Sequence, residues 1–353
     1  MPWFYQVSRI TSSSILKELK FIQNRITDPY FNLALEEFLL RHVPYESCML
    51  WQSRASVVIG KHQNALAEVN VPFVWGENIP VIRRLSGGGT VFHGSGNLNF
   101  TLIREGESGK LIDFKKHTQP VIAFLNNLGI PARFEGKNDL RVHGLKISGN
   151  AEHVLKNRVL HHGTLLFDSD LKQLNEAISV RPGRYVDKSV QSVRSRVANV
   201  SDFLPEPISF GDFKSKLELY LKSFFQQELQ KKGRDFDISD HHLSDEQIGT
   251  VREIAREKYT TWEWNYGYSP DYTFSGYSEM AHGVLKSKLF VRKGVVEEAF
   301  CEYVSSGSPW TLLASDLKGK QHRPDVILEL LKKYSLVEKD VEQIPSNFIT
   351  LFF

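Results

Sequence analysis

Short strand-like segments follow one another along the N-terminal part of this chain, and only single helices interrupt them. A helix is expected over residues 29–42, because Asp28-Pro29 offers an N-cap and a first-turn proline before apolar residues at helical spacing. A second helix is expected over 112–128, and strands are expected at 49–52, 56–60, on both sides of 87–89, and at 97–103, 131–134, 139–142, 145–149 and 159–167. This order favours an α+β fold, with mostly antiparallel sheets and packed helices, over the strict alternation of a Rossmann domain.

The sequence changes character near Trp262, where an aromatic stretch begins. Helices are expected before it at about 210–232 and 244–257, and after it come expected strands near 272–276, 287–293 and 295–303 and helices near 309–317 and 324–333. We therefore predict a large domain over residues 1–261 and a small α+β accessory domain over 262–353.

Residues 179–199 are polar and basic and contain Arg181, Pro182-Gly183, Arg184, Lys188, Arg194 and Arg196. This polar and basic composition, with its Pro-Gly pair, predicts a long loop. Long loops inside compact domains are usually either functional or disordered.

Charge and cysteine content exclude several classes of protein. The 44 basic and 41 acidic side chains leave a net charge of only +3, so there is no electrostatic footprint for a nucleic acid. Cys48 and Cys301 lie far apart, which argues against a disulfide framework or a zinc site and fits a reducing compartment. No apolar run approaches the ~20 residues of a membrane-spanning helix, so no membrane partner is expected.

The N-terminal residues leave two compartments open. The first acidic residue is Glu18, and Arg9, Lys17 and a run of serines precede it, as in some mitochondrial presequences. A secretory signal pattern is missing from the sequence. We expect a cytoplasmic protein, with the mitochondrial matrix as the alternative.

The most informative motif is the segment 83–93, in which Gly87-Gly88-Gly89 separates a basic pair from a β-branched and aromatic strand. Glycines let a backbone approach a ligand closely and present its N–H groups to an anion. Arg84, on the incoming strand, is placed to pair with a carboxylate or phosphate there. A glycine-rich hairpin with surface arginines gives the same pattern, so both interpretations stay open.

A second motif covers residues 136–151. The Asn138-Asp139 turn offers a carboxylate that suits Mg²⁺ beside a triphosphate, and an Asx-type hairpin turn explains it equally well. Lys146 lies between two apolar residues of a predicted strand, so its side chain points to the face opposite theirs. That face is either the wall of a cleft or a solvated surface. Ser148 on the same face, with Gly149 beside it, favours the cleft.

Adjacent histidines, His161-His162, lie on the predicted strand 159–167. Neighbouring strand residues point to opposite faces, so the two imidazoles cannot ligate one metal without distortion. We expect hydrogen-bonding or structural roles for them.

In this order and spacing, the motifs resemble the lipoate–protein ligase family. The resemblance covers 29–34, 51–52, 57–64, the Arg-Arg-x-Ser-Gly-Gly-Gly segment, 136–140, 146–151, 161–166, 192–197 and 261–265. It implies a biotin and lipoyl ligase-like catalytic domain over 1–261, and it covers the last part of the chain only as a small accessory domain that swings between two half-reactions.

The resemblance also implies a role for each matching residue. Lys146 would be the catalytic lysine, in contact with the acyl carbonyl and the α-phosphate, and Asp139 would lie near Mg²⁺. Contacts to ATP or the adenylate are implied for Arg84, Gly89, Thr90, Val91, Phe92, His93, Asn138, Asp139, Lys146 and Ser148. Contacts to lipoate are implied for Arg84, Ser86, Gly87, Gly88, Lys146, His161 and Gly163. The basic loop would fold over the adenylate, and an apolar slot for the acyl tail would use Leu33, Val57, Val58 and Val91.

The implied activity is ATP-dependent: lipoate is converted to lipoyl-AMP with release of pyrophosphate, and the lipoyl group then passes to a lysine of a carrier domain. E2 subunits of 2-oxoacid dehydrogenase complexes and the glycine cleavage H protein are the implied partners. A lipoyl amidotransferase that uses preformed lipoyl-AMP is the alternative, and a non-catalytic lipoyl-binding protein is the alternative of another class. A cysteine-dependent octanoyltransferase fits less well, because neither cysteine lies beside the motif strands.

Overall fold

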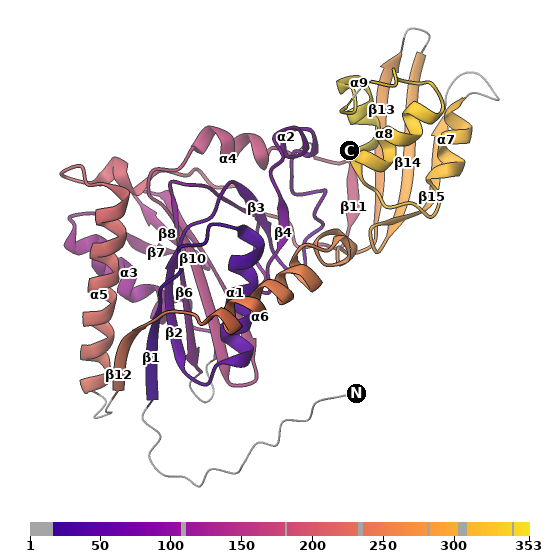
Figure 1. The fold of residues 1–353 in the computed structure, drawn as a ribbon. Coiled ribbons are helices and arrows are strands. Elements are labelled where there is room, and N and C mark those ends of the chain that lie inside the picture. The colour runs from indigo at the N-terminus through magenta and orange to yellow at the C-terminus, as the bar shows by residue number, and fades with distance from the viewer. Residues whose placement is uncertain are drawn as a thin grey trace, which may run out of the picture.

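The computed structural model describes residues 17–106, 111–180, 182–231, 236–280, 283–302, 309–340 and 342–353. The presequence-like residues before Lys17, and Arg181 of the basic loop, lie outside these ranges. Figure 1 shows a large lobe built around one long sheet and a small lobe formed by the C-terminal residues.

The long sheet has the strand order β12-β1-β2-β6-β10-β9-β8-β7. Its strands are β1 (Lys17–Ile22), β2 (Glu46–Trp51), β6 (Asn97–Glu105), β7 (Arg133–Glu135), β8 (Asp139–Val142), β9 (Leu145–Leu155), β10 (Arg158–Leu166) and β12 (Phe236–His241). Only β1 pairs in parallel, with both β12 and β2, among the pairs described for this sheet. The predicted α+β class with mostly antiparallel strands is therefore confirmed.

Helices cover both faces of this sheet. On one face lie α1 (Pro29–His42) and α6 (Asp245–Ile254), and on the other lie α3 (Phe114–Asn127) and α5 (Phe210–Lys231) (Figure 1). Each face has its own apolar core, one around Leu35 and Trp51 and one around Phe124 and Phe213. Helix α1 has the predicted bounds because the Asp28 carboxylate accepts a 2.9 Å hydrogen bond from Phe31 N–H.

A smaller sheet carries the glycine segment. It has the order β4-β3-β5, formed by β3 (Ser56–Ile59), β4 (Val81–Arg83) and β5 (Val91–His93). The predicted strands on both sides of the three glycines are therefore β4 and β5. Two short helices near it, α2 (Val71–Gly76) and α4 (Leu171–Ala177), were not expected from the sequence.

The small lobe contains a sheet of order β11-β13-β14-β15. Its elements are β11 (Tyr185–Asp187), β13 (Tyr272–Met280), β14 (Gly283–Arg292), β15 (Val295–Glu302), α7 (Pro309–Leu317), α8 (Pro324–Lys333) and α9 (Ser346–Phe352). Two π-helical turns, Ala255–Tyr259 and Glu263–Gly267, lead from α6 into this lobe. Strand β11 comes from the predicted basic loop, so the lobe takes one strand from before residue 262. The division at residue 262 stays a prediction.

Further differences from the expected elements lie in the long sheet. Strands β1 and β12 were not expected, and β9 runs on to Leu155 instead of ending near residue 149. None of the described helices has the length and apolar character that crossing a membrane requires.

Candidate active site

A cavity of about 660 Å³ lies beside the glycine turn and is lined by residues of β5, β8, β9 and β10. A second cavity of about 710 Å³ adjoins it between β5, β9, α4 and the basic loop. Both are lined by Thr90, Val91, Lys146, Gly149, Thr164, Gln191, Ser192, Val193 and Ser195. The amine of Lys146 is thus part of the wall that the two cavities share.

Lys146 is held on both sides of its peptide. Its N–H donates to Arg196 O at 2.9 Å, and its carbonyl accepts from Ala198 N–H at 3.1 Å, so residues 196–198 run alongside β9. The side chain passes over Gly149, where an added Cβ would lie 3.2 Å from both Cε and Nζ. The missing side chain of Gly149 therefore leaves room for the Lys146 side chain to run along its strand. The amine lies at the cavity wall.

Asp139 is the counter-ion of this ammonium. Its Oδ1 lies 2.8 Å from Lys146 Nζ and its Oδ2 lies 2.8 Å from Arg141 Nη2. Two cations thus share one carboxylate. Together Lys146, Arg141 and Asp139 carry a net positive charge beside the cavity. Such an excess of positive charge suits the oxygens of a phosphate chain.

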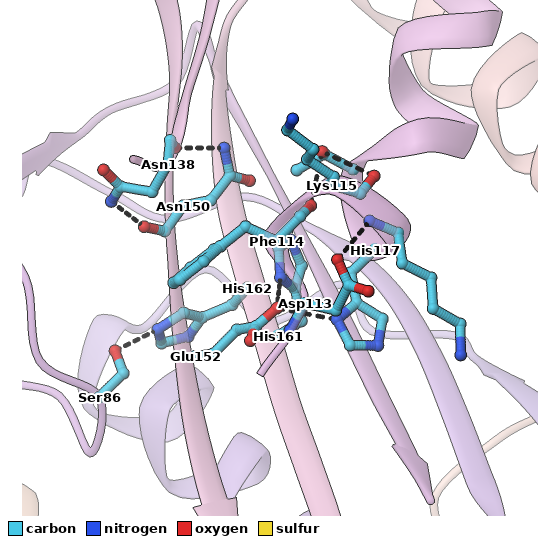
Figure 2. Close-up of polar contacts among 12 residues, drawn as sticks. Ser86, Asp113, Phe114, Lys115, His117, Asn138, Asn150, Glu152, His161 and His162 are labelled. Atoms are coloured by element: carbon cyan, nitrogen blue, oxygen red, sulfur yellow. Dashed lines mark hydrogen bonds and ion pairs between the residues drawn. The ribbon is translucent and has the colours of Figure 1, made fainter. Parts of the chain in front are cut away.

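The Asn138-Asp139 turn is fixed by a second pair of residues. Figure 2 shows Asn138 and Asn150 facing each other across β8 and β9. Asn150 donates to Asn138 O through both its side chain, at 2.9 Å, and its N–H, at 3.0 Å, while the Asn138 amide donates to Asn150 O. These contacts hold Asp139 in register with Gly149, over which the Lys146 amine lies.

The glycine turn packs tightly against the turn that follows β3. A Cβ on Gly60 would lie 2.1 Å from Gly88 O, and Gly88 itself has a φ of +85°. Both positions therefore require glycine. The turn is pressed onto its neighbour and its remaining backbone faces the cavity.

Arg84 supports this turn from inside. Its guanidinium donates to Ser86 Oγ at 2.9 Å, Val58 O at 3.1 Å, Gly87 O at 2.6 Å and Gly89 O at 2.7 Å. Burial lowers the pKa of Arg84 to about 10, which leaves the side chain charged at neutral pH. Arg84 lines the cavity, but most of its donors are already used by the turn.

His162 links Arg84 to a buried acid that sequence reasoning missed. Its Nε2 lies 2.6 Å from Ser86 Oγ (Figure 2), and its Nδ1 lies 2.9 Å from Glu36 Oε2. Glu36 is 2% exposed and also accepts from Thr101 Oγ1 at 2.6 Å. A chain of hydrogen bonds thus orients His162, which lines the cavity. Glu36 lies among the apolar residues of α1 that face the core. An acidic residue at such a position is the sequence signal that could have revealed it.

His161 lies on the opposite face of β10, in a cluster with His117 and Glu152 (Figure 2). Both imidazole Nδ1 atoms contact Glu152 Oε1, at 2.8 Å from His117 and 2.9 Å from His161, and Asp113 N–H donates to Oε2 at 3.0 Å. Burial raises the pKa of Glu152, but the hydrogen bonds from the two histidines outweigh it and lower this pKa to about 2.

The ligand atoms of this cluster lie within 4.8 Å of one another, as a metal ion would require. A metal-ligating imidazole normally donates its other N–H to a partner, and His161 Nε2 is buried without one among the described residues. We interpret the cluster as a hydrogen-bonded group that fixes the start of α3. Phe114, at that start, lines the cavity.

Part of the cavity wall is apolar. Leu33, Val58 and Val91 of the predicted acyl slot line it, together with Trp51. Val57 is fully buried in the core and does not line the cavity. The ring of His93 lies at 78° to that of Trp51, 5.5 Å from it, and burial lowers the pKa of His93 to about 3. His93 is therefore a neutral imidazole at the wall.

The basic loop forms the opposite wall. Ser192 Oγ accepts from Thr90 N–H at 2.8 Å and donates to Glu68, and Ser192 N–H donates to Glu68 Oε1 at 3.2 Å. Arg141 donates to Ser195 Oγ at 3.1 Å. The segment 190–195, predicted only as part of a long loop, thus closes the cavity over the glycine turn.

Most of the predicted site residues lie together around the two cavities. Those that line one or both are Arg84, Gly88, Gly89, Thr90, Val91, Phe92, His93, Asn138, Asp139, Lys146, Ser148 and Gly163. Ser86 and Gly87 belong to the glycine segment but do not line either cavity, and His161 lies on the other face of the sheet. The ligand that each residue contacts stays a prediction.

An apolar slot that opens onto a cationic, glycine-walled chamber defines a catalytic domain suited to an acid with an apolar tail beside an anionic partner. Residues 28–222 match the family model of the lipoyl protein ligase A/B catalytic domain. A lipoate–protein ligase of Staphylococcus aureus is 38% identical over 323 residues, which cover 90% of this chain and 95% of the relative.

Solved structures agree. A bipartite lipoate–protein ligase studied with its E2 lipoyl domain, from Thermoplasma acidophilum, has a TM-score of 0.60 and 26% identity over 71% of this chain and 97% of its own. A lipoate–protein ligase A bound with ATP has a TM-score of 0.58 and 25% identity over 72% of this chain and 100% of its own. This chain belongs to the lipoate–protein ligase family and is a ligase.

Proposed function

We propose that this enzyme activates lipoate with ATP to form lipoyl-AMP and pyrophosphate, and then transfers the lipoyl group to the ε-amine of a lysine on a carrier domain. The observation that carries this proposal is the position of Lys146, whose amine lies in the wall between an apolar slot and a second chamber. The family to which the chain belongs, and the ATP in a related structure, support it.

In the first half-reaction a lipoate carboxylate oxygen attacks the α-phosphorus of ATP and pyrophosphate leaves. Negative charge then grows on the α-phosphate oxygens. Lys146 supplies positive charge without rearrangement, because backbone hydrogen bonds already hold its strand in place. Leu33, Trp51 and Val58 hold the acyl tail and keep water away from the mixed anhydride.

In the second half-reaction a neutral lysine amine of the carrier attacks the acyl carbon of lipoyl-AMP. The carbonyl oxygen becomes negative, AMP leaves as its phosphate anion, and the attacking nitrogen gives its extra proton to that phosphate or to solvent. Lys146 is placed to stabilise that oxygen in this step too, so the same cation serves both reactions. The chemistry requires no covalent enzyme intermediate.

Asp139 is the residue that would hold Mg²⁺. It lines the cavity, it contacts Lys146 and Arg141 there, and one carboxylate with phosphate oxygens is a common Mg²⁺ environment. Two cations already surround this carboxylate, so a divalent ion is favoured there only when a triphosphate brings negative charge. When bound, the ion would offset charge on the leaving pyrophosphate.

The proposed partners are lipoyl-carrier domains, namely those of E2 subunits and the glycine cleavage H protein. The archaeal relative studied with its E2 lipoyl domain supports the first of them. The cytoplasmic location, and the mitochondrial matrix as its alternative, stay predictions.

Lipoate-dependent exchange of pyrophosphate into ATP tests the proposal. We expect the purified protein to exchange label only when lipoate is present, and then to lipoylate an E2 domain from lipoate and ATP. An amidotransferase would transfer the lipoyl group from supplied lipoyl-AMP without any exchange. A protein that binds lipoate but does neither would be a non-catalytic binder, and either result would overturn the proposal.

A further inference from the structure

Arg83 is a buried cation whose role the site chemistry leaves open. It is 0% exposed, and burial lowers its pKa to about 10, so it remains charged at neutral pH. Among the described residues it forms no ion pair, and the acceptors of its guanidinium are carbonyl or hydroxyl oxygens. A buried charge without a counter-ion is costly, so these oxygens must hold it closely.

Half of these acceptors belong to the turn after β3. Arg83 Nη1 donates to Gly60 O at 3.1 Å, Lys61 O at 3.0 Å and Gln63 O at 2.7 Å. This is the turn that presses against Gly88. The position of the guanidinium therefore fixes the backbone on which the glycine turn rests.

The other acceptors belong to the residues that lead into the small lobe. Arg83 Nε donates to Trp264 O at 3.0 Å, and Nη2 donates to Asn265 O at 2.8 Å and Ser269 Oγ at 2.9 Å. The backbone adds two contacts, from Arg83 N–H to Asn265 Oδ1 at 2.9 Å and from Trp264 Nε1 to Arg83 O at 2.8 Å. Residues 262–269, which we call the linker, are thus bound to the same guanidinium as the turn.

The Gln63 side chain continues this connection to the cavity. Its Oε1 accepts from Gly60 N–H at 2.7 Å and from Thr90 Oγ1 at 3.0 Å, and its Nε2 donates to Ser192 Oγ at 3.0 Å. Thr90 and Ser192 both line the cavity. An unbroken series of hydrogen bonds therefore runs from the linker through Arg83 and Gln63 to the wall where the nucleotide is proposed to bind.

We propose that Arg83 is a positioning residue that couples the nucleotide end of the active site to the linker of the small lobe. This inference rests on the proposed function. Occupation of the site by lipoyl-AMP tightens the contacts of Thr90 and Ser192, and Arg83 passes that change to the linker. Coupling of this kind is reciprocal, so the state of the linker also sets the affinity of the site.

Hydrogen exchange of the linker amides, with and without ATP plus lipoate, tests the coupling. In the wild type we expect exchange of residues 262–269 to slow when lipoyl-AMP forms. In Arg83→Gln, ATP plus lipoate should still slow hydrogen exchange at the cavity wall but should no longer slow it in the linker. Arg323→Gln is the matched control, because the Arg323 guanidinium lies 5.1 Å from the Trp262 ring centroid of the same linker but donates its side-chain hydrogen bonds to Gln321 and Asp325. Ligand-dependent protection that persists in Arg83→Gln would overturn the proposal.

Gln63→Ala covers the case in which Arg83→Gln fails to fold, because it removes the step to Thr90 and leaves the backbone acceptors of Arg83 in place. We expect it to raise the KM for ATP by about 5- to 150-fold with a smaller change in kcat. It should also remove the response of the linker. If Arg83→Lys folds, the double variant Arg83→Lys with Gln63→Ala should raise the KM for ATP no further than the single variant with the larger effect. The reason is that both residues lie on one series of hydrogen bonds. Additive losses would overturn the coupling.

The two proposals fail in different ways. Absence of lipoate-dependent pyrophosphate exchange in the wild type would overturn the proposed function. An active enzyme whose linker exchanges equally fast with and without ATP and lipoate would overturn the coupling alone.

Discussion

The Lys146 ammonium lies 2.8 Å from the Asp139 carboxylate, although the two residues are not paired across β8 and β9. Asp139 is in register with Gly149, and the lysine side chain runs along its own strand to reach it. The acid thus holds the cation in place until phosphate oxygens compete for it. A glycine, an acid and a lysine share one function, and each can be changed separately.

Lys146→Ala should remove both half-reactions while the domain stays folded. Loss of one preorganised cation of this kind costs on the order of 10²- to 10³-fold in rate. Pyrophosphate exchange and transfer from synthetic lipoyl-AMP measure the two steps, and circular dichroism checks the fold. Lys172→Ala, at an exposed lysine of α4, serves as the control. Near-normal adenylation by folded Lys146→Ala would contradict the assignment.

Gly149→Ala should displace the amine without removing it. The new Cβ would lie 3.2 Å from Lys146 Cε and Nζ, so the side chain must shift by a few tenths of an ångström. A small misplacement of a catalytic group lowers rate sharply, and we expect about a tenfold to hundredfold loss. Gly249→Ala, in α6 with open space around its Cβ, should keep full activity and stabilise the helix by about 0.5–1 kcal/mol. Equal activity in the two variants would argue against a positional role for Gly149.

Asp139→Ala should weaken Mg²⁺-dependent adenylation more than transfer from synthetic lipoyl-AMP. Only the first step brings a triphosphate, whose charge favours a divalent ion beside this carboxylate. The Mg²⁺ concentration that gives half-maximal exchange should rise in the variant. Equal losses in the two steps would mean that Asp139 acts only through Lys146.

The free energy of unfolding should fall as the pH is lowered from 7 towards 4. Burial lowers the pKa of His161 to about 4, so between about pH 6.5 and 4 the unfolded chain binds a proton that the folded protein rejects. Each such histidine costs about 1.4 kcal/mol per pH unit in that window, and His322, whose pKa burial also lowers to about 4, behaves alike.

Urea unfolding at several pH values measures this slope. Below about pH 4.5 the loss continues, because Glu152 has its pKa lowered to about 2 and the folded form keeps its carboxylate charged. His161→Asn should reduce the slope of unfolding free energy against pH by the contribution of one proton, about 1.4 kcal/mol per pH unit. His62→Gln, at an exposed position, should leave the slope unchanged. A wild-type stability that does not vary between pH 7 and 5 would contradict this prediction.

Local sequence patterns predicted the elements whose cause is local. Helix α1 begins at its Asp28 cap, and α7 and α8 have the expected bounds. Strands β1 and β12 were missed because they form a parallel pair whose ends lie more than two hundred residues apart, a contact that no short window contains. Strand β11 was missed because its partner, β13, begins only at Tyr272, far along the chain from Tyr185–Asp187.

The site followed the same division. Lys146, Asp139 and the glycine turn could be found because their chemistry lies within short motifs. Glu36 could not, since its contacts with His162 and Thr101 join an N-terminal helix to two distant strands. Arg83 and Arg84 look equivalent in sequence, and only the fold separates the one that holds the linker from the one that supports the glycine turn.

The segment that covers the cavity, residues 188–196, is attached to the rest of the fold at both ends. One end of the segment 188–196 follows β11, which is paired with β13 of the small lobe, and the other end adjoins Val197, which is bridged to Lys146. Fully extended, this segment spans about 30 Å. Displacement of the small lobe therefore moves the segment that covers the reacting groups. The length of this segment also limits how far the lobe can move before β11 must separate from β13.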